Sequence, residues 1–97
     1  MKLSVTSSAA QWFIHEFDLQ DGDAIKLSTR IYGGIETIFP DYFLSISVDD
    51  SSSSSFETVV EGIRFLIDPN DEWLLQNHIL SIERTSDDDV RYVFTEA

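Results

Sequence analysis

The sequence predicts one α+β domain over residues 1–97, with about six mostly antiparallel strands in small twisted sheets and two short helices. Three observations lead to this fold class. Several short segments alternate apolar and polar residues, as strands with one buried face do. One segment instead has the three- and four-residue spacing of an amphipathic helix. Finally, 97 residues are too few for two hydrophobic cores, and 42% of them are hydrophobic, including seven Phe.

A strand and a helix are expected first. Residues 2–6 alternate as a short strand, and Thr6, Ser7 or Ser8 can provide the N-cap of the helix that follows. Four apolar residues then share one helical face: Ala10, Phe13, Ile14 and Phe17. Trp12 lies roughly opposite this face, so we expect its indole to pack under a neighbouring loop, with contact to a partner as the alternative.

The middle of the chain predicts two strands that flank a loop. Residues 24–32 and 43–49 both alternate, and residues 33–42 between them can close an antiparallel hairpin. The polar stretch at residues 49–57, which includes the serines at 51–55, is interpreted as a mobile loop within one domain.

The last third predicts a hairpin, a short helix and two more strands. The hairpin covers residues 56–67 with its bend at Glu61-Gly62. Asp68 is then the N-cap and Pro69 the first residue of the short helix. Residues 78–84 and 90–95 form the final pair of strands, joined by an acidic turn.

Charge and cysteine content exclude several classes of function. Eighteen acidic residues against six basic ones give a formal net charge of −12, which repels nucleic acid and anionic membranes. Suitable partners are cations or basic protein surfaces, although negative charge also simply favours solubility. With zero Cys there is no disulfide, thiolate nucleophile or sulfur-ligated metal. No apolar run is long enough to span a bilayer, and we expect a cytoplasmic protein.

Metal binding would have to use oxygen and nitrogen ligands. The candidates are Glu36 and Asp41 in the loop at residues 33–42, together with His15 and His78. The two histidines are far apart in sequence and have no HExxH spacing, so an unligated surface position is the ordinary interpretation of each. The serines are not in a nucleophile elbow, which argues against a serine hydrolase.

Two motifs resemble the HesB-like family, the A-type carriers of iron–sulfur cluster biosynthesis. The first is a strand that ends in Gly33-Gly34, and the second is "GIRFLIDPNDEWLL", in which Gly62 precedes Asp68-Pro69 and a short helix. Together with the opening "SVTSSAAQWF", they follow the family's order over nearly the whole chain. The resemblance implies the compact HesB-like fold.

The same resemblance removes the family's chemistry. Family members are thought to bind iron or a cluster through a Cys after Gly-Gly and a C-terminal Cys-x-Cys, whereas this chain has Ile35 at the first position and no cysteine at all. The resemblance therefore implies a non-enzymatic accessory or partner-binding protein without a cofactor of its own. Two alternatives stay open: an iron or divalent-metal carrier, and an acidic module that occupies a basic protein site. The oligomeric state is not predicted.

Overall fold

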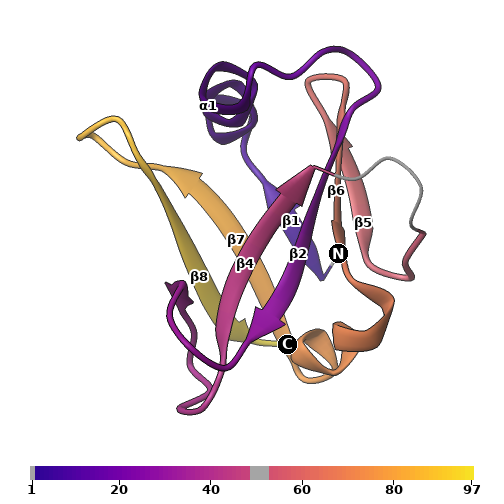
Figure 1. Ribbon diagram of the computed structural model, residues 1–97, viewed down its shortest axis with the longest axis vertical. Coiled ribbons are helices and arrows are strands. Elements are labelled where there is room, and N and C mark those ends of the chain that lie inside the picture. The colour runs from indigo at the N-terminus through magenta and orange to yellow at the C-terminus, as the bar shows by residue number, and fades with distance from the viewer. Residues whose placement is uncertain (1, 49–52) are drawn as a thin grey trace.

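A computed structural model describes residues 2–48 and 53–97 of the chain (Figure 1). Residues 49–52, which belong to the expected polar loop and the end of the expected strand at 43–49, lie outside the described residues. The elements, in chain order, are β1 (Leu3–Val5), α1 (Ser7–Phe17), β2 (Ala24–Arg30), β3 (Ile35–Glu36), β4 (Phe43–Val48), β5 (Glu57–Val60), β6 (Ile63–Ile67), the 3₁₀ helix η1 (Pro69–Leu75), β7 (His78–Arg84) and β8 (Val90–Glu96).

The strands form two mixed sheets, which confirms the α+β class. One sheet has the strand order β1-β7-β8 and the other β3-β4-β2-β6-β5. The pairs β2–β4, β5–β6 and β7–β8 are antiparallel, as expected, but β1 pairs with β7 and β2 with β6 in parallel. Among the described residues there are eight strands, against an expectation of about six: seven form in the segments expected to be strands, and the two-residue β3 forms inside the loop and pairs with β4.

The helix and the turns follow the local signals of the sequence. Thr6 is the N-cap of α1, and its hydroxyl accepts a hydrogen bond from the Ala9 amide at 3.1 Å. Glu61 and Gly62 both have positive φ at the β5–β6 bend, which suits a tight hairpin turn. The Asp68 carboxylate accepts from the Asn70 amide at 2.9 Å and so caps η1.

The hydrophobic core fills the space that the sheets and α1 enclose. Phe13 on α1 and Phe65 on β6 are fully buried, and their ring centroids lie 5.4 Å apart. In Figure 1, α1 lies at one end of the molecule, whereas β3, the loop before β4 and η1 lie at the opposite end. No helix of the described residues is both long and apolar enough to cross a membrane.

The Gly33-Gly34 pair makes the turn that leads from β2 into β3. Gly34 has a φ of +125°, and a Cβ there would lie 2.6 Å from the carbonyl oxygen of Leu44. Residues other than glycine are strained at such a φ, and the neighbouring strand leaves no room for a side chain. Backbone geometry is therefore sufficient to explain these glycines, without any ligand-binding role.

Candidate interaction surface

The loop between β3 and β4 is held in one shape by Thr37. Its hydroxyl oxygen lies 3.1 Å from the carbonyl oxygen of Phe39 and 2.9 Å from that of Tyr42, and it accepts a hydrogen bond from the Phe39 amide at 3.0 Å. The Tyr42 amide donates to the Phe39 carbonyl at 3.1 Å. These bonds fix the directions in which the side chains of Phe39 and Tyr42 leave the loop.

Phe39 joins three segments that are distant in sequence. Its ring centroid lies 5.3 Å from that of Trp73 on η1, 5.7 Å from His78 on β7 and 6.0 Å from Phe94 on β8, always in an edge-to-face arrangement. Tyr42 also packs edge to face on Trp73, with centroids 5.1 Å apart. Such pairs add to the stability that ring burial provides, so the rings support one another at this end of the molecule.

Large hydrophobic side chains are unusually exposed at this end. Of the eight that are exposed in the described residues, five belong to the β2–β4 connection or η1: Ile31, Tyr32, Ile38, Tyr42 and Trp73. We name Phe39, Tyr42 and Trp73, whose rings pack on one another, the aromatic surface. Trp73 is 40% exposed and Ile38 51% exposed. Clustered Trp and Tyr side chains that remain accessible are typical anchors of protein–protein interfaces.

A small hollow opens beside these rings. It has a volume of about 200 Å³ and is lined by Glu36, Thr37, Phe39, Pro40, Tyr42 and Phe43. We name it the loop hollow. Because Phe39 and Tyr42 belong both to its wall and to the aromatic surface, the two features are continuous.

The loop hollow carries negative charge. Residues 31–42 and 68–77 contain five carboxylates, of which Glu36 alone lines the hollow, and the nearest cation in the sequence is the exposed Arg30, in register with Phe43. Three of these carboxylates are engaged within the fold: Asp68 with Lys26, Asp71 with Thr29, and Glu72 with the serines at 54 and 55. Glu36 and Asp41, by contrast, are exposed and form no ion pair with any described residue. Their charges are available to a partner.

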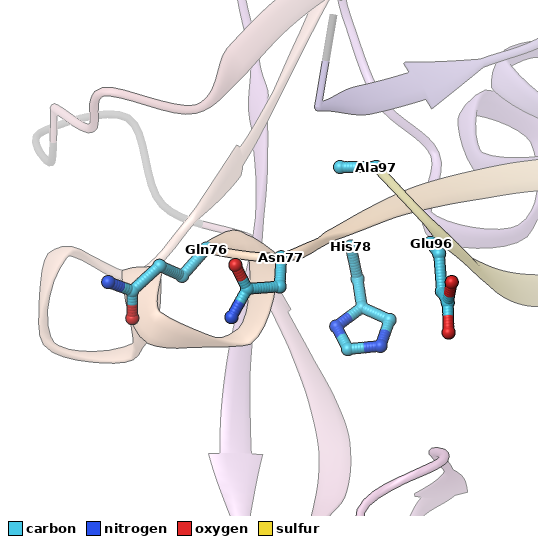
Figure 2. Close-up of a pocket in the computed structure, with 5 residues that line it drawn as sticks. All are labelled: Gln76, Asn77, His78, Glu96 and Ala97. Atoms are coloured by element: carbon cyan, nitrogen blue, oxygen red, sulfur yellow. The ribbon is translucent and has the colours of Figure 1, made fainter.

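The four candidate metal ligands do not gather at one site. His15 lies exposed on α1, at the opposite end from Glu36 and Asp41. His78 begins β7 in register with Glu96, and both side chains point into a second hollow of about 300 Å³, with Gln76, Asn77 and Ala97 (Figure 2). In the described part of the chain, no three His, Asp or Glu side chains are grouped so that they could hold a metal ion. Metal binding by these residues stays a prediction.

Sequence reasoning identified the loop at residues 33–42 but missed the aromatic surface. Trp73 and Phe94 were not candidates, because only the packing of η1 and β8 against the loop brings them to Phe39. One signal was available. Trp73 directly precedes Leu74 and Leu75, which are both buried; three consecutive residues of a helix point in different directions, so a short helix that buries the two leucines leaves Trp73 partly exposed. For the other tryptophan, packing under a loop is confirmed, since the Trp12 indole donates to the Asp88 carbonyl at 2.9 Å.

Comparison with known proteins gives relatives of nearly the same length. No family model matches the chain. It is 28% identical over 89 residues to a Bacillus subtilis protein named pyruvate dehydrogenase inhibitor, covering 92% of this chain and 93% of that protein. It is also 26% identical over 85 residues to an uncharacterized Staphylococcus saprophyticus protein, covering 86% and 87% of the two chains.

These findings contradict the HesB-like assignment and the role in iron–sulfur cluster biosynthesis that it implied, and neither is retained. The metal-carrier alternative gains no support from them either. The motifs behind the resemblance have local explanations: Gly33 and Gly34 turn the chain with positive φ, Gly62 completes a hairpin, and Asp68-Pro69 starts η1. Short motifs of this kind recur wherever the same turns occur. Over 92% of its length the chain is similar to a protein named as an inhibitor of pyruvate dehydrogenase.

Proposed function

We propose that this chain is a non-catalytic regulatory protein that binds pyruvate dehydrogenase and inhibits it. The observation that carries the proposal is the similarity to the Bacillus subtilis pyruvate dehydrogenase inhibitor, which extends over 92% of this chain and 93% of that protein. Similarity along the full length means that the relative's activity does not have to reside in a segment that this chain lacks.

The exposed aromatic surface supports a mechanism by protein contact. An inhibitor that is not itself a substrate must remain bound long enough to block its enzyme, and buried aromatic anchors slow dissociation. Trp73 and Tyr42 have rigid rings that lose little conformational freedom on binding. The exposed carboxylates of Glu36 and Asp41 beside this surface favour binding to a basic region of the enzyme.

The test is inhibition by the purified chain. Pyruvate dehydrogenase from Bacillus subtilis is incubated with increasing amounts of this chain, and the initial rate of NADH formation from pyruvate is measured, with the Bacillus subtilis inhibitor as positive control. We expect saturable inhibition together with co-elution of the chain and the enzyme in gel filtration. A rate that stays unchanged while the positive control inhibits would reject the proposal.

A further inference from the structure

The loop hollow combines two chemical features in one small space. A carboxylate, Glu36, shares the wall with the rings of Phe39, Tyr42 and Phe43 and with Pro40. Lysine and arginine side chains have an apolar stem that packs on hydrophobic surface and a cationic head that carboxylates and aromatic faces attract. A hollow of about 200 Å³ with these walls matches the chemistry of one such side chain.

We propose that the loop hollow receives a lysine or arginine side chain of the protein partner. This inference rests on the proposed function, so the partner in question is pyruvate dehydrogenase. Glu36 pairs with the cationic head, while Phe39 and Tyr42 contact the stem. Trp73, which packs on both Phe39 and Tyr42, then covers apolar surface of the partner next to that side chain, which excludes water from the ion pair and strengthens it.

Charge complementarity favours a basic partner over a second copy of this chain. The chain has a net charge of −12, so two copies repel each other. Five of its six Lys and Arg side chains already make a hydrogen bond or ion pair within the chain: Lys2, Lys26, Arg64, Arg84 and Arg91. A second copy therefore has few cations left to insert into the hollow.

The loop is also preorganised for binding. The Thr37 hydroxyl lies within hydrogen-bond distance of the backbone of Phe39 and Tyr42, so two walls of the hollow are already in position before a partner arrives. A preformed site loses less conformational entropy on association than a loop that must first become ordered.

The first test compares matched variants in the inhibition assay. Glu36→Lys reverses the charge in the hollow, and Glu16→Lys makes the same charge change on the exposed surface of α1. Trp73→Ala and Phe17→Ala each truncate an aromatic residue that is 40% exposed, but at opposite ends of the molecule. We expect Glu36→Lys and Trp73→Ala each to raise the half-inhibitory concentration about tenfold or more, and the two α1 variants about twofold or less.

Three outcomes of this comparison would overturn the inference. One is equal weakening by Glu36→Lys and Glu16→Lys, which would make net charge the cause. Another is inhibition by Trp73→Ala that is as strong as that of the wild type. The third is a wild-type chain that sediments as a dimer and becomes a monomer in Trp73→Ala, because the surface would then contact a second copy of this chain.

A second test does not depend on the enzyme and therefore separates the two proposals. A tetra-arginine peptide is titrated into the ¹⁵N-labelled chain, and chemical-shift changes are mapped along the sequence. We expect the largest changes at residues 36–43 and at the Trp73 indole, and weaker ones at the acidic β7–β8 turn, where Asp87 and Asp88 are exposed but do not line this hollow. Chemical-shift changes that are as large at the β7–β8 turn as at residues 36–43 would show that the loop hollow is not a specific site for the cationic side chain, even if the wild-type chain inhibits the enzyme. If the largest chemical-shift changes lie in the loop hollow but the chain does not inhibit the enzyme, pyruvate dehydrogenase is rejected as the partner, whereas the loop hollow remains a binding site for a cationic side chain.

Discussion

The two ends of the molecule each contain a tryptophan, and the two side chains are held in different ways. Trp12 lies at the α1 end, half-buried, with its ring centroid 5.0 Å from that of Phe13 and its indole N–H bonded to the Asp88 carbonyl. Trp73 lies at the loop end, where it packs on Phe39 and Tyr42 and remains 40% exposed. Trp12 is thus hydrogen-bonded to a distant turn, whereas Trp73 packs on the loop and leaves much of its ring accessible.

The difference comes from what lies beneath each cluster. Phe13 connects the α1 cluster to the core through Phe65, and the β7–β8 turn accepts the Trp12 hydrogen bond, whereas Phe17 at the edge of this cluster stays 40% exposed. Phe39 connects the loop cluster to β7 and β8, but no described segment covers Tyr42 and Trp73 from outside. Exposed aromatic area that costs solubility is usually retained for an interaction.

The largest expected effect is at the α1 end. Phe13→Ala empties a fully buried position and should lower the free energy of unfolding by about 3–5 kcal/mol. Trp73→Ala should lower it by only about 1 kcal/mol, because the ring is partly solvated in the folded state. Urea titration monitored by circular dichroism measures both values. Equal losses would mean that the loop cluster is as important to the fold as the core, and the contrast between the ends would disappear.

The next largest effect tests whether the loop end depends on its turn. Gly34→Ala forces a side chain into a positive φ and against the Leu44 carbonyl, which should cost about 1–3 kcal/mol and displace β3. We expect weaker inhibition of pyruvate dehydrogenase than with Gly22→Ala, whose added Cβ meets nothing within 4 Å, although its positive φ also causes strain. Equal inhibition by the two variants would show that the turn does not position the loop hollow.

A smaller effect is expected from the indole hydrogen bond at the α1 end. Trp12→Phe removes the donor to the Asp88 carbonyl but keeps an aromatic ring, so the free energy of unfolding should fall by about 1 kcal/mol. Inhibition should be unchanged, since the loop end is not altered. If Trp12→Phe abolished inhibition without unfolding the chain, the binding surface would have to be placed at the α1 end instead.

The smallest effect appears only in alkaline solution. Burial, together with the Asp89 carboxylate, raises the pKa of Tyr92 above its ordinary value. The folded state therefore keeps this proton when the unfolded state has lost it. The resulting contribution to stability is complete below about pH 10 and is lost as the pH rises toward the pKa of the folded state. Tyr92→Phe should make the urea midpoint fall less steeply above about pH 10 than in the wild type. Parallel pH profiles for the two proteins would contradict this assignment.

Most local structure was predictable because it depends on neighbouring residues. The bend at Glu61-Gly62 and the start of η1 at Asp68-Pro69 form where the sequence placed them, and the cap of α1 is Thr6, one of the three candidates. The same local character explains why the HesB-like resemblance misled. Its glycines are explained by the turns in which they lie, and many unrelated chains make such turns. Only alignment over the whole length pointed to a different relative.

The sequence by itself determined the α+β class, the order of the elements apart from β3, and the acidic character of the chain, because alternation, capping and charge are properties of short segments. Tertiary structure alone decided the parallel pairing of β1 with β7 and of β2 with β6, since neither pair is adjacent in the chain. It also decided the site. Phe39, Trp73 and Phe94 meet only when the loop, η1 and β8 pack at one end of the molecule, and no spacing in the sequence encodes that contact.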